Sequence, residues 1–348
     1  MKSALSIVAL FSLPGMLFAQ GSPSPAPHRH VAKPDAPIPL HESSRQVIAS
    51  ETGGAFMSGA KCDASGNLYI RKLATDRPLL GPVVKIDSEG KRVALFDPAS
   101  FSDPKLDRAD AFSPAPDGGL YQLAGTDGLK PQIYVTRFAA DGSPASSAKI
   151  DAEFEPYQFA AFPGGNLLVS GVQRDVLNKS DLGRNFTAVF SDDGRLLARL
   201  SFEPPQTAGK SQHGATADEA KPTLDISEAE AAPDGNIYAL RRSFPTLVYV
   251  ISAAGKIVHT LKLSPPDHGV APTSFHVSGN RVAISFWNDE KESQVLVVVD
   301  SQTGRTIATY SDPGRLGPSF ACYSADDGSF TFLQLGEQNT MEVVTASE

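Results

Sequence analysis

Extended runs of helical periodicity are missing from this sequence. Apolar residues do not recur every three to four positions over a useful length, so few helices are expected. An excess of positive charge is missing too, because the 348 residues carry a formal net charge of −8. Nucleic-acid binding requires a basic surface, so we expect no nucleic-acid partner. The basic residues are scattered, which also argues against a patch that binds a membrane surface.

The motifs of common catalytic sites are absent as well. The sequence has no Gly-x-Ser-x-Gly turn around a nucleophile and no His-Glu-x-x-His pair for zinc. The sequence has two cysteines and they are not vicinal. The sequence motifs therefore do not indicate a particular reaction.

The longest apolar run lies in the first residues of the sequence. Lys2 precedes the apolar residues 4–13, and Ala19 ends an acceptable cleavage site, so residues 1–19 predict a signal peptide. This run is too short to span a bilayer, and no later segment is longer. We therefore expect a secreted or periplasmic protein without membrane insertion. The proline-rich residues 20–44 predict an extended, disordered linker.

A glycine turn between short apolar runs recurs along the rest of the chain. In the clearest copy, Asp234-Gly235 precedes the strand-like residues 237–240 and 247–251, then a second turn at Gly255 and a further run. Asp-Gly and Gly-Asn are typical of hairpin turns, since glycine adopts positive φ without a Cβ clash. The first turn of each unit contains Gly66, Gly118, Gly165, Gly235, Gly279 and Gly328.

Four short antiparallel strands in each repeated unit are typical of a β-propeller. The sixth unit ends after its third strand, and residues 45–50 can supply the missing outer strand from the other end of the chain. Such closure removes exposed sheet edges. The sequence thus predicts an all-β fold over residues 45–348: a six-bladed β-propeller of four-stranded antiparallel blades, closed by an N-terminal strand.

The repeat unit also resembles a known family. Residues 232–238, Ala-Pro-Asp-Gly-Asn-Ile-Tyr, followed by a Val-Tyr-Val-Ile strand and residues 254–256, Ala-Gly-Lys, are similar to an NHL-type repeat of six-bladed propellers. Residues 241–246 lack the Asn-Arg-Ile element that usually opens the third strand of that repeat. The family includes binding scaffolds, lactonases and lyases, so the resemblance implies a fold and leaves the function open.

Acidic residues were considered as metal ligands. The lactonases of this fold hold a divalent cation in the central channel with Glu, Asn and Asp side chains. Asp110, Glu228 and Glu230 stand near the starts of innermost strands, but the lactonase motif surrounds none of them. Asp97 and Asp103 crowd the connection before Asp110, where a solvated acidic loop is favoured over a calcium loop. No metal site is assigned, and a divalent cation such as calcium belongs only to the alternative function.

His276 and Trp287 each allow two interpretations. His276 lies on an innermost strand, where a hydrogen-bonded structural histidine is favoured over a catalytic base, because no Ser or Cys nucleophile is tied to it by sequence. Trp287 follows the second strand of the fifth unit. It forms either a lid on the blade core or a surface on which a ligand stacks.

The two cysteines lie in the first and sixth units. Cys62 precedes Gly66 by four residues and Cys322 precedes Gly328 by six, so both point to the same side of innermost strands. These units become neighbours only when the ring closes. In an oxidising compartment we hypothesise a Cys62–Cys322 disulfide, and two buried free thiols remain the alternative.

Long, varied loops are expected at one end of the ring and tight glycine turns at the other. Binding usually resides on long loops carried by a rigid scaffold. The favoured function is an exported binding or scaffold protein, a monomer, that recognises an unknown small molecule or protein at the long-loop end. A lactonase-like or other hydrolase is the alternative. The candidate ligand-binding residues are Arg71, Asp110, Tyr157, Glu230, Arg241, Arg242, His276, Trp287 and Asn288.

Overall fold

The computed structural model describes residues 36–48, 58–74, 76–127, 132–152, 154–173, 183–202, 226–266, 270–288, 290–312, 316, 319–337 and 340–348. The predicted signal peptide, residues 20–35 of the predicted linker and the predicted loop 203–225 lie outside these residues. Among the helices in the described ranges, none is long and apolar enough to cross a membrane.

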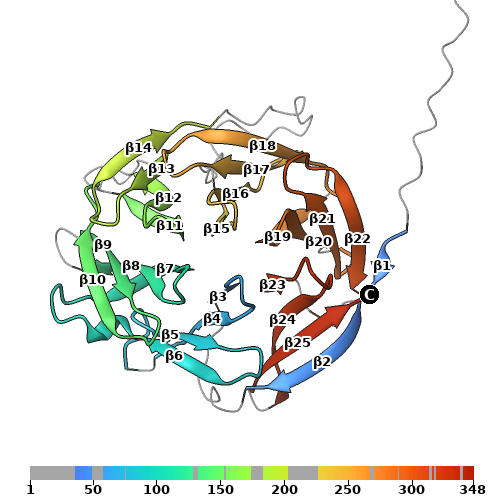
Figure 1. The fold of residues 1–348 in the computed structure, drawn as a ribbon, viewed down its shortest axis with the longest axis horizontal. Helices are drawn as coiled ribbons and strands as arrows, with labels where there is room; N and C mark the ends of the chain where they lie inside the picture. Colours follow the sequence, from blue (N-terminus) through green and yellow to red (C-terminus); the bar gives the residue numbers. More distant parts are fainter. Residues whose placement is uncertain are drawn as a thin grey trace, which may run out of the picture. The chain divides into compact units, whose positions relative to one another are not determined.

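Residues 36–348 form six antiparallel sheets arranged as blades around a ring (Figure 1). Blade 1 consists of β3 (Ser58–Cys62), β4 (Leu68–Arg71), β5 (Val83–Ile86) and β6 (Arg92–Phe96), and blade 2 of β7 (Arg108–Pro114), β8 (Leu120–Thr126), β9 (Gln132–Phe138) and β10 (Pro144–Lys149). Blade 3 consists of β11 (Glu155–Ala161), β12 (Leu167–Gln173), β13 (Arg184–Phe190) and β14 (Leu196–Leu200), and blade 4 of β15 (Glu228–Ala231), β16 (Ile237–Arg241), β17 (Thr246–Ile251) and β18 (Ile257–Leu263). Blade 5 consists of β19 (Ala271–Ser278), β20 (Arg281–Asn288), β21 (Ser293–Asp300) and β22 (Thr306–Asp312), and blade 6 of β23 (Cys322–Tyr323), β24 (Phe330–Leu335), β25 (Met341–Ser347) and β2 (His41–Val47). A short 3-10 helix, η2 (Pro98–Ser100), follows β6.

The ring is closed by β2, which pairs antiparallel with β25, with Arg45 opposite Val344. The predicted closure is therefore confirmed, but the closing segment is longer than expected. β2 begins at His41, and β1 (Ile38–Pro39) already pairs in parallel with β22 of blade 5. Residues 38–44 thus belong to the propeller rather than to the predicted linker. Prolines suggested a linker here, yet an edge strand such as β1 tolerates proline, and Leu40 is buried.

The predicted glycine turns join the strands as expected. Gly235 has a φ of 85°, and the carboxylate of Asp234 accepts a hydrogen bond of 2.9 Å from the backbone N–H of Asn236. Asp63 makes the same bond to Ser65 in blade 1. These turns satisfy their own polar groups and leave short, compact connections at one end of the ring, which we call the tight-turn end.

Apolar side chains fill the spaces between neighbouring blades. Phe330 and Phe332 of β24, for example, pack with Leu296 and Val298 of β21, so one cluster joins blades 5 and 6. Another cluster places Leu123 and Val135 of blade 2 against residues of blade 3. Because side chains alternate along each strand, both faces of a blade are covered by its neighbours. This packing holds the innermost strands rigidly around the central channel.

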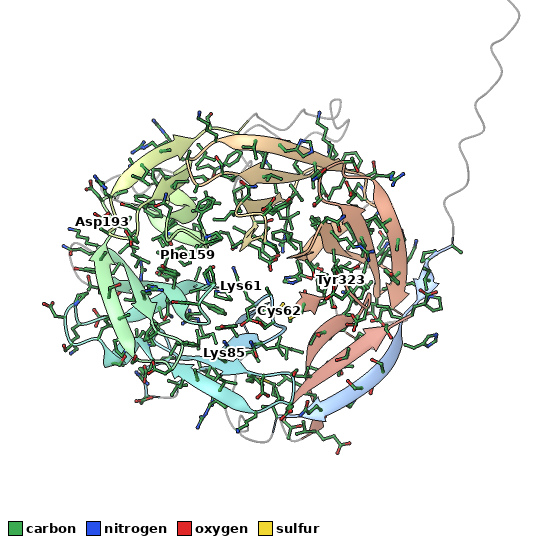
Figure 2. All side chains as sticks on the ribbon, viewed as in Figure 1. Lys61, Cys62, Lys85, Phe159, Asp193 and Tyr323 are labelled. Carbon is green, nitrogen blue, oxygen red and sulfur yellow. A yellow bond between two sulfur atoms is a disulfide. The ribbon has the colours of Figure 1, made fainter. Side chains whose placement is uncertain are left out.

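The disulfide between Cys62 and Cys322 is formed, with their Cα atoms 5.8 Å apart. It connects β3 of blade 1 to β23 of blade 6, at the innermost strands of the ring (Figure 2). The pairing hypothesised from the two turn offsets is confirmed.

Candidate functional site

A cluster of charged side chains lies in the central channel. Lys61 of β3, Glu228 and Glu230 of β15, and His276 of β19 line one small cavity. Its volume of about 10 Å³ is roughly the room that one water molecule needs. The remaining lining residues are Ala60, Ala229, Phe275, Phe320 and Ala321. The innermost strands of blades 1, 4 and 5 and the segment before β23 of blade 6 thus contribute to one polar centre.

Lys61 reaches across the channel (Figure 2). Its ammonium donates hydrogen bonds to the backbone carbonyl of Ala229 in blade 4, at 3.0 Å, and to that of Phe159 in blade 3, at 3.4 Å. Burial lowers the pKa of Lys61, while the charges of Glu228 and Glu230 act in the opposite direction. One side chain of blade 1 therefore ties together blades on the far side of the ring.

Glu230 and His276 form a contact that the sequence did not reveal. His276 Nδ1 pairs with Glu230 Oε1, and Glu230 Oε2 accepts a hydrogen bond of 3.2 Å from the backbone N–H of Val277. Cys62 Sγ lies 3.4 Å from Nε2 and 3.7 Å from Nδ1 of the same ring. The His276 imidazole therefore contacts both the Glu230 carboxylate and a disulfide sulfur.

Glu228 lies two residues before Glu230, so both project from the same face of β15. Burial raises the pKa of Glu228 to about 7, with the charge of Glu230 adding to the rise and that of Lys61 opposing it. Folding therefore favours the protonated form of Glu228.

Replacing Glu228 by glutamine should remove a pH dependence of stability. Since its pKa rises from 4.5 to about 7, protonated Glu228 contributes stability that is fully present below pH 4.5 and is lost as the pH rises through about 7. We expect the free energy of unfolding of Glu228→Gln, relative to the wild type, to increase by about 1–3 kcal/mol between pH 4.5 and 7.5. Urea unfolding at several pH values measures this difference. Exposed Glu89→Gln is the control, and parallel curves for Glu228→Gln and the wild type would contradict the expectation.

Two of the predicted ligand-binding residues instead connect blades 1 and 2. The Arg71 guanidinium donates to the carbonyls of Gly81 and Asp110, and lies 5.4 Å from the centroid of the Phe112 ring. The carboxylate of Asp110 lies 3.5 Å from Arg108 Nε, and burial raises its pKa. These groups are occupied within the fold rather than directed together at a ligand.

The other predicted residues are divided between the interior and the surface. Arg241 is buried and donates to the hydroxyl of Tyr249 at 3.1 Å, and buried Asn288 accepts from the backbone N–H of Lys291. Arg242 is on the surface of the protein, where it donates to the carbonyl of Thr273. Tyr157 is exposed, and Trp287 is half-buried. Of the whole predicted set, the channel cavity brings together Glu230 and His276.

Lys61 was missed by the sequence analysis, although a usable signal was present. The glycine turn at Gly66 placed Cys62 on an innermost strand, and the adjacent Lys61 must then lie next to the channel. A lysine among small residues at such a position can therefore be predicted to lie at the channel, as a carboxylate there can.

The donor groups do not fit a divalent cation in the channel. Within the described ranges, no three His, Cys, Asp or Glu side chains are grouped so that they could hold a metal ion. The Lys61 ammonium shares the cavity with both glutamates. In the connection between β6 and β7, where aspartates cluster, the Asp97 carboxylate accepts two hydrogen bonds of 2.7 Å from the Arg77 guanidinium.

Comparisons with known proteins found distant similarities among solved structures. No protein-family model and no curated protein matches the sequence. Among solved structures, a protein of unknown function from Bacteroides caccae is 12% identical, with a TM-score of 0.49 over 77% of this chain and 85% of that one. The Pan2 WD40 domain of Neurospora crassa is 10% identical, with a TM-score of 0.46 over 88% of this chain and 94% of that one.

The Dos1 propeller is 13% identical, with a TM-score of 0.42 over 84% of this chain and 78% of that one. The chain is a six-bladed β-propeller. These similarities are too distant to transfer an activity.

Proposed function

We propose that this protein binds a protein partner at the long-loop end of the ring, opposite the tight-turn end. The observation that carries the proposal is the exposure of large apolar side chains there. Leu79 in the β4–β5 connection is 63% exposed, Phe244 in the β16–β17 connection 59%, and Leu335 at the end of β24 61%. Apolar anchors of this kind are typical of protein interfaces.

The shape of this end supports a protein rather than a small ligand. The three side chains come from blades 1, 4 and 6, so a partner that contacts them all must be extended. A small-molecule site would be an enclosed pocket, whereas the channel cavity has room for about one water. Beside Leu335, an open depression of about 790 Å³ is lined by Val47, Arg45, Glu337 and Glu342 among others. Apolar contacts with charged groups around them suit a protein surface.

The alternative hydrolase function receives less support. It requires a divalent cation in the channel, and the residues there do not fit one, because Glu230 is engaged by His276 and Val277 beside the Lys61 ammonium. A relation to NHL-type propellers remains part of our proposal and rests on the repeat unit alone. The disulfide is compatible with an extracellular or periplasmic protein. We further propose that residues 1–19 direct export and that the protein is a monomer.

Two double variants test whether the partner binds at the long-loop end. The partner protein is first isolated by cross-linking to the wild-type protein in the native organism. The double variant Leu79→Ser with Phe244→Ser should bind this partner about tenfold more weakly, or more weakly still. The control is Val258→Ser with Ile307→Ser on β18 and β22, the fourth strands of blades 4 and 5, whose side chains are 56% and 45% exposed. It should retain wild-type affinity. Loss of binding in the control pair alone, or in neither pair, would overturn the proposal, as would a wild-type ligand that proves to be a small molecule.

A further inference from the structure

The strand β2 is the outermost strand of blade 6, and one of its two edges is free (Figure 1). Within the described residues, β25 pairs with its inner edge and no strand pairs with its outer edge. The strand is exposed from His41 to Arg45, and Val47 near its end is 50% exposed. A free edge of this kind presents backbone N–H and C=O groups with which another chain can pair.

The pairing with β25 shows which backbone groups of β2 are free. The N–H of Ile48 donates to the carbonyl of Met341 at 2.8 Å. In an antiparallel pair, hydrogen-bonded residues alternate with residues whose backbone groups point away from the partner strand. Gln46 therefore bonds to β25 as Ile48 does, whereas the backbone groups of Arg45 and Val47 point outward. These two residues offer two donors and two acceptors to an added strand.

The first half of β2 is protected against such pairing. The register shifts between Glu42 and Ser44, and the hydroxyl of Ser43 donates to the carbonyl of Thr345 at 3.1 Å. A bulge of this kind commonly protects an edge strand. The register is regular after Ser44, so the unprotected part of the edge is the end that contains Val47.

This open part of the edge lies beside the depression at the long-loop end. Val47 and Leu335, which is 61% exposed, are its large apolar side chains. Arg45 and Val47 are two residues apart, so their side chains lie on one face of β2. The side chain of Gln46 lies on the other face, where its amide donates to the carbonyl of Glu89 in blade 1. A residue added opposite Val47 would place its side chain on the same face as Val47, in the depression.

The charges around the depression favour a basic segment. The guanidinium of Arg45 bonds to the carboxylates of Glu42 and Glu342. Glu337 also lines the depression, and no cation of the described part of the chain pairs with it. Three carboxylates thus surround one cation, and a lysine or arginine of a partner would compensate the excess negative charge.

We propose, on the basis of the protein-binding function above, that the partner adds an extended segment to the free edge of β2 as a fifth strand of blade 6. The segment places an apolar side chain beside Val47 and Leu335 and a lysine or arginine next to Glu337. The neighbouring blade already has a fifth strand, since β1 pairs with β22. A fourth strand of this ring is thus able to take up a further strand at its edge.

Amide hydrogen exchange followed by NMR tests the added strand directly. The partner isolated by cross-linking should slow exchange at Arg45 and Val47 by about tenfold or more, whereas Gln46 and Ile48 should be protected in the free protein already. Binding that leaves Arg45 and Val47 unprotected would overturn the proposal. Protection that appears in the free protein with rising concentration would overturn it too, because a second copy would then occupy the edge.

A phage-displayed library of random heptapeptides provides a probe that does not depend on the partner. Peptides selected on the folded wild-type protein should alternate β-branched apolar residues with other residues that include lysine or arginine. The synthetic form of the most enriched peptide should protect the same two amides and should compete with the partner. Selected peptides that protect neither amide would contradict the proposal.

Val47→Pro removes one outward N–H and leaves the pairing with β25 in place, because an edge strand tolerates proline at such a position. It should bind the partner about tenfold more weakly than Val47→Ala, which loses the same side chain but keeps the N–H. Glu337→Lys should also weaken binding, by about threefold or more, whereas Glu89→Lys, at an exposed residue of the tight-turn end, is the control and should not. Circular dichroism confirms that each variant is folded. Equal binding by Val47→Pro and Val47→Ala, or by Glu337→Lys and Glu89→Lys, would contradict the added strand.

The same binding measurements separate this inference from the proposed function. If Leu79→Ser with Phe244→Ser weakens binding and Val47→Pro does not, the partner binds at the long-loop end and the added strand is wrong. If Val47→Pro alone weakens binding, the added strand stands and the anchors Leu79 and Phe244 are wrong. If neither change weakens binding, both proposals are wrong.

Discussion

Removing residues 20–48 is expected to lower the melting temperature by about 10 °C or more, whereas removing residues 20–35 should leave it nearly unchanged. The longer deletion takes away β1 and β2, so β25 loses its antiparallel partner. It also removes Leu40 and Ile48, whose burial contributes about 3–6 kcal/mol together. Thermal unfolding followed by circular dichroism compares the two truncations.

The exposed edge gives this prediction a second readout. Without β2, the unpaired backbone groups of β25 are free to pair with another chain. We expect concentration-dependent association of the longer truncation, measured by analytical ultracentrifugation, and none for the shorter one. Equal melting temperatures for the two proteins would show that β2 does not stabilise the ring.

Phe330→Ala should lower the free energy of unfolding by about 3–5 kcal/mol. Phe330 is fully buried between blades 5 and 6, with its ring centroid 4.9 Å from that of Tyr323 and 5.3 Å from that of Phe320. The alanine would leave a cavity that these large rings cannot readily fill. Urea unfolding measures the change.

Leu335→Ala supplies the control for this substitution on the same strand. Its side chain is exposed, so we expect a change within about 0.5 kcal/mol. If Phe330→Ala were as mild as Leu335→Ala, the aromatic cluster between blades 5 and 6 would not be a main source of stability.

The blades could be predicted from the sequence because their signals are local. A turn such as Asp234-Gly235-Asn236 needs positive φ at its glycine, and the flanking apolar runs need only a strand on either side. The disulfide followed from the same local signals, since the turns at Gly66 and Gly328 aligned Cys62 with Cys322. The start of the closing segment was harder to predict, because Pro39 is typical of a linker although it lies in an edge strand.

The candidate site depends on long-range packing, which no local pattern contains. Lys61 bonds to carbonyls of Phe159 and Ala229, almost 100 and 170 residues away. Arg241 was expected on a loop face, but its guanidinium folds back onto Tyr249 of the next strand and is buried. A sequence indicates that a polar residue is near a channel or a loop. Which partner it finds there depends on how neighbouring blades pack.

The pairing of β2 with β25 also has a consequence for the order of events during biosynthesis. Ser43 bonds to the carbonyl of Thr345, 302 residues further along the chain. β2 is therefore synthesised long before its partner β25 and must wait, unpaired, until that strand has been made. Bringing such distant segments together carries a large loop-closure entropy, so closure of blade 6 is expected to be a late step of folding. Late completion of the fold suits the export that we propose above, because a channel that accepts only unfolded polypeptides could still take up such a chain.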